Sequence, residues 1–183
     1  AVCNCPGMNA VAVAELTMGL LICCDRRLPD QTAELRAGKW DKKEFGKARG
    51  LKGTTLGIVG VGNIGSELAK RAIAFGMTVV GYDVVPFKTS LAVKAVTLDE
   101  LLAQADVISL HVPKTQGPIL GPAEFAKMKK GVILVNAARG GVVDEKALLE
   151  ALNSGVVRAA AIDVFAKEPP EDWTLVDHPN VVA

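Results

Sequence analysis

The sequence predicts an α/β fold of the doubly wound, Rossmann type, in which a parallel sheet lies between two layers of helices. Short apolar runs typical of buried strands alternate with segments whose apolar residues recur at helical spacing. A glycine-rich stretch closely follows the first of these runs. Hydrophobic residues make up 50% of the 183 residues, yet aromatic residues only 4%. We therefore expect a core built from Val, Ile, Leu and Ala, which is the mixture that parallel sheets favour.

The expected elements alternate regularly along the chain, which favours a parallel sheet. The expected strands are short apolar runs at residues 54–59, 78–83, 105–111, 131–136 and 157–164. The expected helices lie at residues 12–27, 31–37, 66–75, 98–104, 122–129 and 145–153. Residues 12–27 are apolar on nearly all sides, so we expect this helix to be buried against a large partner, such as another subunit. Pro29 ends it, Asp144 suits the N-cap of the last helix, and Gly155 suits that helix's C-terminal exit.

Residues 60–65, with the sequence Gly-Val-Gly-Asn-Ile-Gly, have the strand, tight turn and helix context of a dinucleotide-binding fingerprint. Gly60 permits a sharp turn, Gly62 lets the backbone approach a pyrophosphate, and Gly65 lets the helix pack closely on its strand. The N–H groups at the helix start attract phosphate. The alternative is a plain turn between a strand and a helix.

Asp83 ends the second expected strand, roughly 20 residues after the fingerprint, where a ribose-binding carboxylate belongs. A carboxylate there accepts hydrogen bonds from the ribose hydroxyls and repels a 2′-phosphate. The sequence therefore predicts NAD rather than NADP as the cofactor. The alternative is a solvated acid at the end of a strand.

A second cluster, residues 136–141, follows the strand expected at 131–136. Ligands bind outside the carboxyl ends of such strands, and Arg139 beside two glycines is suited to hold a carboxylate with two parallel hydrogen bonds. Asp163 lies at the end of the next strand and Glu168 follows that strand, and both are expected at the same crevice. A surface arginine and solvated acids are the alternative interpretation.

Charge and composition exclude several classes of protein. The net charge is +1 with no long run of one sign, which argues against nucleic acid or an anionic membrane as partner. The chain contains neither an apolar stretch long enough to span a bilayer nor a secretory signal. Four cysteines, Cys3, Cys5, Cys23 and Cys24, lack the spacing of a zinc site or a disulfide framework. We therefore expect reduced thiols, no metal and a cytoplasmic location.

These motifs together resemble the D-isomer-specific 2-hydroxyacid dehydrogenases over essentially the whole chain. The resemblance rests on residues 60–65, Asp83, and residues 109–113, 136–145 and 163–170. It implies that residues 1–183 are the nucleotide-binding domain of a longer chain, with a split substrate domain outside them. It also implies a homodimer built largely through the cofactor domains, a role that the helix at residues 12–27 fits.

The same resemblance implies roles for individual residues. Arg139 matches the arginine that binds the substrate carboxylate and keto oxygen, and Glu168 matches the glutamate that supports a catalytic histidine. Neither His111 nor His178 matches that histidine, which we expect outside this chain. The positions expected to line the cofactor are Gly60, Gly62, Asn63, Ile64, Gly65, Asp83, His111, Val112, Pro113, Ala137, Ala138, Arg139 and Asp163.

Residues 114–118 depart from the family pattern. The family more often has Leu-Thr-Pro followed by a threonine at these positions, whereas this segment begins with Lys114. The implied substrate is a 2-hydroxy acid, phosphorylated in the preferred interpretation, with glyoxylate or hydroxypyruvate as the alternative substrates. A second class of function also stays open. Transcriptional corepressors resembling C-terminal-binding protein use this fold and NAD chiefly to control dimerisation.

Overall fold

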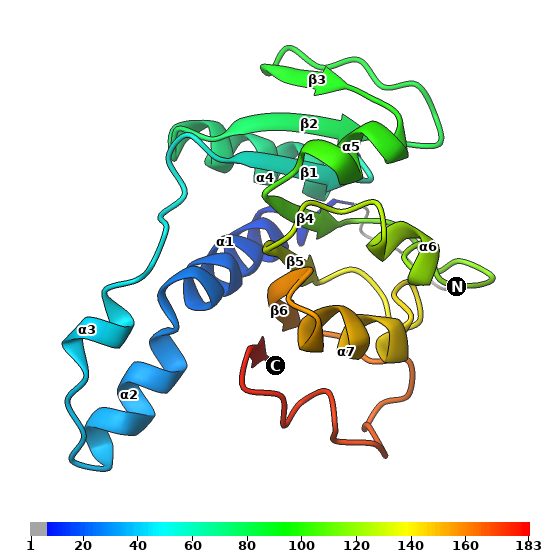
Figure 1. The fold of residues 1–183 in the computed structure, drawn as a ribbon. Coiled ribbons are helices and arrows are strands. Elements are labelled where there is room, and N and C mark those ends of the chain that lie inside the picture. The colour runs from blue at the N-terminus through cyan, green and yellow to red at the C-terminus, as the bar shows by residue number, and fades with distance from the viewer. Residues whose placement is uncertain (1–6) are drawn as a thin grey trace.

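The computed structural model describes residues 7–183, which form a sheet of seven strands covered by helices on both faces (Figure 1). The strands are β1 (Thr55–Val59), β2 (Thr78–Tyr82), β3 (Val93–Ala95), β4 (Val107–Leu110), β5 (Val132–Asn136), β6 (Val157–Ile162) and β7 (Val181–Val182). The helices are α1 (Ala10–Arg26), α2 (Leu28–Arg36), α3 (Lys42–Phe45), α4 (Asn63–Ala74), α5 (Leu98–Gln104), α6 (Pro122–Phe125) and α7 (Glu145–Asn153).

The strand order is β3-β2-β1-β4-β5-β6-β7, and every neighbouring pair is parallel. The chain builds outward from β1 to β2 and β3, then returns to place β4 on the other side of β1. The connections that leave β1 and β4 therefore diverge, and the carboxyl ends of these two strands flank a crevice of the kind that binds ligands in such sheets. The predicted fold class is confirmed.

Each face of the sheet has its own apolar core. Helices α1 and α4 cover one face, where Leu21 and Leu68 pack against β1 residues such as Ile58. Helices α5, α6 and α7 cover the other face, and Leu101 and Leu148 are fully buried there. The two layers of helices and the sheet between them form the three-layer arrangement expected from the alternating pattern.

Helix α1 is buried by its own domain. Its inward face packs on α4, β5 and β6, and the buried Asp25 forms an ion pair with Arg158 of β6, with 2.7 Å between Oδ1 and Nη2. Val11 and Leu16 remain 46% and 43% exposed. The partner of the buried face of this helix is thus α4 together with the sheet.

Helices α2 and α3 stand away from the sheet as an arm (Figure 1). The turn between α1 and α2 is made by Arg27, with φ 53°, and Pro29 lies in the first turn of α2. A proline there needs no hydrogen-bond partner, so Pro29 is accommodated in α2, which begins at Leu28. The prediction that Pro29 ends α1 is therefore wrong, because α1 ends at Arg26. The Arg27 guanidinium holds the arm together through Asp30 at 2.9 Å and Glu44 at 3.1 Å.

In residues 7–183, no helix is long and apolar enough to cross a membrane. Cys3 and Cys5 lie outside the described residues, whereas Cys23 and Cys24 are free thiols. Burial raises the pKa of the Cys24 thiol to about 12, so this cysteine stays protonated and unreactive.

Candidate functional site

The fingerprint loop, residues 60–65, lies at the carboxyl end of β1 and contacts the end of β4. Gly60 has φ +94°, and a Cβ there would lie 2.4 Å from the carbonyl oxygen of His111 and 3.1 Å from Val112 Cγ1. A Cβ on Gly65 would lie 2.3 Å from the carbonyl oxygen of Gly60. Both glycines are therefore required by the protein's own packing, because a side chain at either position would displace backbone.

Gly62 differs from its two neighbours in the motif. No atom of the described chain lies within 4 Å of the position where its Cβ would be. Gly62 is also the N-cap of α4, and no side chain caps that helix. The first N–H groups of α4 are thus left without a side-chain acceptor next to an open approach for a ligand. This arrangement fits the pyrophosphate of a dinucleotide.

Asp83 connects the end of β2 to the fingerprint loop. Its Oδ2 accepts a hydrogen bond from the N–H of Val61 at 2.8 Å, and its Oδ1 accepts one from Val85 at 3.2 Å. A carboxylate has acceptor sites for about four hydrogen bonds, so these two contacts leave capacity for ribose hydroxyls. The same contacts hold the carboxylate beside the loop.

The backbone of His111 contacts the fingerprint loop and the end of β1. Its N–H donates to the carbonyl of Val59 at 2.8 Å, and its carbonyl lies against Gly60. The ring turns back along β4 so that Nε2 lies 2.9 Å from Ser109 Oγ, and the buried Nδ1 has no partner in residues 7–183. Burial lowers the pKa of His111 to about 4, so the ring is neutral at pH 7.

Arg139 lies beyond the end of β5 in a loop that the buried Asn136 organises. Asn136 Nδ2 donates to the carbonyl of Arg139 at 3.2 Å, and its Oδ1 accepts the N–H of Ala138 at 3.2 Å. Arg139 itself is exposed and donates Nη1–H to the carbonyl of Ala138 at 2.6 Å. The side chain of Asn136 thereby fixes the backbone from which the guanidinium projects.

The loop after β6 is held against the loop after β5. The N–H of Asp163 donates to the carbonyl of Asn136 at 3.0 Å, and Ala166 N–H donates to Glu145 Oε1 at 2.8 Å. A Cβ on Gly140 would lie only 1.8 Å from the carbonyl oxygen of Phe165. Close approach of the two loops thus depends on the missing side chain of Gly140.

A hollow of about 370 Å³ opens where these loops meet, and we call it the Arg139 hollow. Its lining includes Lys114, Ala138, Arg139, Gly140, Phe165 and Glu168. Glu168 Oε1 accepts the N–H of Phe165 at 3.1 Å, which orients this carboxylate within its own loop. A cation that can grip a carboxylate and an acid that can hold a protonated imidazole therefore share one cavity.

The structure brings the predicted residues together in two adjoining groups. Gly60, Val61, Asp83, His111 and Val112 meet around the fingerprint loop, and residues 136–140 meet residues 163–168 beside it. Sequence reasoning did not assign a site role to Asn136, Glu145 or Lys114. Asn136 stood within the recognised cluster, and its position at the end of a buried strand was the available signal.

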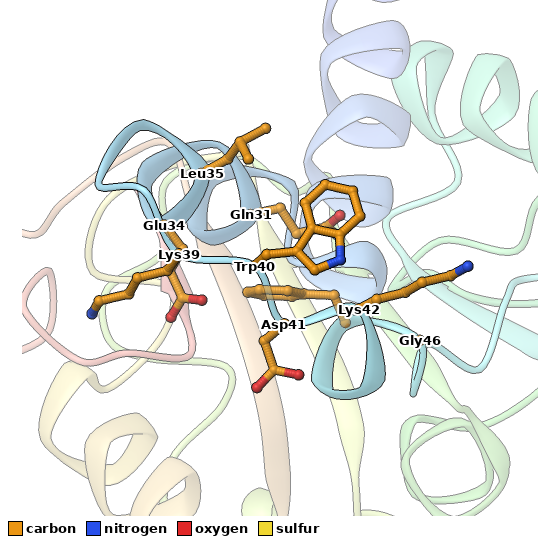
Figure 2. A pocket seen from close by; sticks show the side chains of 9 residues that line it. Gln31, Glu34, Leu35, Lys39, Trp40, Asp41, Lys42 and Gly46 are labelled. Carbon is orange, nitrogen blue, oxygen red and sulfur yellow. The ribbon is translucent and has the colours of Figure 1, made fainter.

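A second hollow lies on the arm, away from the strand ends (Figure 2). It is lined by residues of α2, α3 and the stretch between them, among them Leu35, Trp40 and Phe45. Trp40 is 78% exposed. In residues 7–183, no cluster of three or more His, Cys, Asp or Glu side chains is arranged to hold a metal ion.

Comparison with known proteins identifies the family. Residues 18–183 match the model of the D-isomer specific 2-hydroxyacid dehydrogenase, NAD binding domain. Hydroxypyruvate reductase of Thermotoga maritima is 50% identical over 100% of this chain and 61% of its own length. D-3-phosphoglycerate dehydrogenase of Methanocaldococcus jannaschii is 49% identical over 99% of this chain and 36% of its own length.

The solved structures agree with this assignment. D-lactate dehydrogenase from Aquifex aeolicus, complexed with NAD and lactic acid, matches with a TM-score of 0.86 and 33% identity. The match covers 94% of this chain and 58% of that one. The chain thus spans between about a third and three fifths of these relatives. It belongs to the D-isomer specific 2-hydroxyacid dehydrogenase family, as an NAD-binding domain of that family.

Proposed function

We propose that the protein containing this domain oxidises 3-phosphoglycerate to 3-phosphohydroxypyruvate with NAD. The observation that carries this proposal is the Arg139 hollow, where Arg139 and Glu168 meet at the strand ends beside the fingerprint loop. A 2-hydroxy acid needs both groups, one for its carboxylate and one for the acid–base partner of its hydroxyl. The 49% identity to a D-3-phosphoglycerate dehydrogenase supports the substrate.

NAD supplies the acceptor for the hydride that leaves C2 of the substrate. Arg139 orients the substrate, because its remaining N–H groups form a planar fork that matches a carboxylate. Glu168 holds and stabilises the protonated form of an acid–base histidine contributed from outside this chain. Neither histidine of this chain lines the hollow, since the His111 ring contacts Ser109 and His178 Nδ1 accepts the N–H of Asn180 at 3.1 Å.

The test uses the full-length protein and its Arg139→Lys variant. We expect NAD-dependent oxidation of 3-phosphoglycerate, with kcat/KM lowered about tenfold or more by the substitution, because an ammonium cannot form the fork. Arg36→Lys, at the exposed end of α2, is the matched control and should behave as wild type. If the Arg139→Lys variant kept the kcat/KM of the wild type, Arg139 would not be the residue that binds the substrate carboxylate.

Hydroxypyruvate or glyoxylate reduction is the second candidate, and the 50% identity to a hydroxypyruvate reductase favours it. Comparing kcat/KM for 3-phosphohydroxypyruvate with that for hydroxypyruvate and glyoxylate, all with NADH, separates the two. NADH binding without turnover of any of these acids would instead favour an NAD-dependent corepressor.

We also propose that the protein is a homodimer. Supporting this, α1 leaves Val11 and Leu16 exposed, and the arm carries the exposed Leu35 and Trp40 (Figure 2). Exposed apolar groups gathered on a projecting segment are typical of association surfaces. Sedimentation equilibrium should give twice the mass of one chain, and a single-chain mass at micromolar concentration would contradict the proposal.

A further inference from the structure

We propose that Lys114 is a specificity-determining residue that binds a second anionic group of the substrate while Arg139 binds its carboxylate. The inference rests on the proposed function and narrows its substrate class. It predicts a preference for 2-hydroxy acids that carry a second negative group, either a phosphate or another carboxylate. Lys114 is therefore assigned to substrate recognition and not to the cofactor.

The C-terminal part of the loop that carries Lys114 is hydrogen-bonded to the segment that follows Arg139. The N–H of Ile119 donates to the carbonyl of Val142 at 2.8 Å, and the N–H of Asp144 donates to the carbonyl of Leu120 at 2.9 Å. These bonds connect the segment after β4 to the segment after β5. Lys114 and Arg139 line one cavity from these two loops.

The charges that line the Arg139 hollow are unequally satisfied. Glu168 accepts the N–H of Phe165, and Arg139 donates one N–H to the carbonyl of Ala138. Lys114 makes no hydrogen bond and no ion pair with any residue of the described chain, 7–183. Lys114, Arg139 and Glu168 are the charged residues that line the cavity. Because the negative charge of Glu168 is balanced when it holds a protonated imidazole, the charges of the two cations are left for a ligand. The cavity therefore suits a ligand with two negative groups.

Lys114 brings a charge to the Arg139 hollow that an apolar side chain at this position would not offer to a ligand. The ammonium of Lys114 is a compact point charge on a flexible stem. It can reach a phosphate or a carboxylate at some distance from the carboxylate that Arg139 holds.

The experiment compares three 2-oxo acids in the full-length protein with NADH as the reductant. 3-Phosphohydroxypyruvate carries a carboxylate and a phosphate, oxaloacetate carries two carboxylates, and hydroxypyruvate carries one. The variant is Lys114→Gln. The matched control is Lys167→Gln, an exposed lysine that contacts Glu171 and does not line the hollow. Steady-state kcat/KM is measured for each acid, with KM for NADH measured in parallel.

We expect Lys114→Gln to lower kcat/KM about tenfold or more for the acid with the preferred second anionic group, as for loss of a hydrogen bond to a charged group. The value for hydroxypyruvate, KM for NADH and the control variant should not change. The 2-oxo acid whose kcat/KM falls most in the variant shows whether Lys114 binds a phosphate or a carboxylate.

Three outcomes overturn the inference. They are an equal loss for all three acids, no loss for any of them, and a rise confined to KM for NADH. Reduction of hydroxypyruvate by the wild type, with no gain from a second anionic group, overturns both this inference and the phosphoglycerate assignment. A wild-type protein that prefers 3-phosphohydroxypyruvate or oxaloacetate to hydroxypyruvate, with a variant that reduces both acids equally well, overturns the role of Lys114 alone.

Discussion

Replacement of Gly62 by alanine should separate cofactor binding from folding. The backbone at Gly62 has φ −76° and ψ −155°, an extended conformation open to alanine, and nothing in the described chain lies within 4 Å of the new methyl group. We therefore expect the free energy of unfolding to change by less than about 1 kcal/mol. The methyl group would instead meet the pyrophosphate of NAD. Overpacking of one methyl costs about 1–3 kcal/mol, or about 5-fold to 150-fold in Kd.

The assay is a fluorescence titration of NADH against wild type and Gly62→Ala, with urea denaturation of both proteins in the absence of cofactor. Gly19→Ala is the matched control, because Gly19 is exposed on α1 and a methyl group added there would also have no neighbouring atom within 4 Å. That variant should bind NADH as the wild type does. An unchanged Kd for Gly62→Ala would refute the reasoning that the pyrophosphate passes this glycine.

Two further predictions concern Asp83 and His111. Asp83→Ala should weaken NAD binding and reduce the preference for NAD over NADP, because the ribose acceptor and the charge that repels a 2′-phosphate are both lost. An unchanged ratio of the Kd values for NADP and NAD would contradict the ribose-binding role of Asp83. The pKa of His111 is lowered by burial to about 4 from 6.5, so the unfolded chain takes up the proton first as pH falls. The free energy of unfolding should therefore decrease between about pH 6.5 and 4, by up to about 3 kcal/mol. His111→Gln should flatten this slope in urea denaturation curves, and an identical slope would show that His111 does not cause it.

Helices whose ends are encoded locally were predicted best. The bounds of α5 and α7 agree with the sequence prediction, because their N-caps are written in neighbouring residues. Thr97 and Glu100 form a capping box at α5, and Asp144 accepts the N–H groups of Lys146 and Ala147 at α7. Gly155, with φ +74°, makes the exit expected after α7.

The edge strands and helix α3 were not predicted, and α6 was predicted too long. Strands β3 and β7 are only 3 and 2 residues long and are partly exposed, so they carry no strong apolar pattern. Each exists because a longer neighbour, β2 or β6, offers its free edge. Helix α3 formed within a stretch expected to be irregular, and α6 ends at Phe125 although its pattern continued to residue 129. Such elements depend on tertiary context that local patterns do not contain.

The positions of the candidate site residues followed from the sequence, but their contacts did not. Parallel topology brings the ends of β1, β4, β5 and β6 to one edge, so motifs at strand ends were sufficient to locate the crevice. Glu145 and Ala166, in contrast, are 21 residues apart, and Asp25 pairs with Arg158 across 133 residues. No local pattern predicts either partner. Nor does a local pattern predict that the ring of His111 contacts Ser109.

The glycines of the two motifs serve two different purposes that their sequence pattern does not distinguish. Gly60, Gly65 and Gly140 each face backbone at a distance that excludes a Cβ, so a side chain there would disturb the protein with or without a ligand. Gly62 alone among these four faces open space, so the packing of the described chain does not require its lack of a side chain. Loss of NAD binding in a Gly60, Gly65 or Gly140 variant would therefore say little about where the cofactor lies. The same loss at Gly62, with the fold intact, would place it.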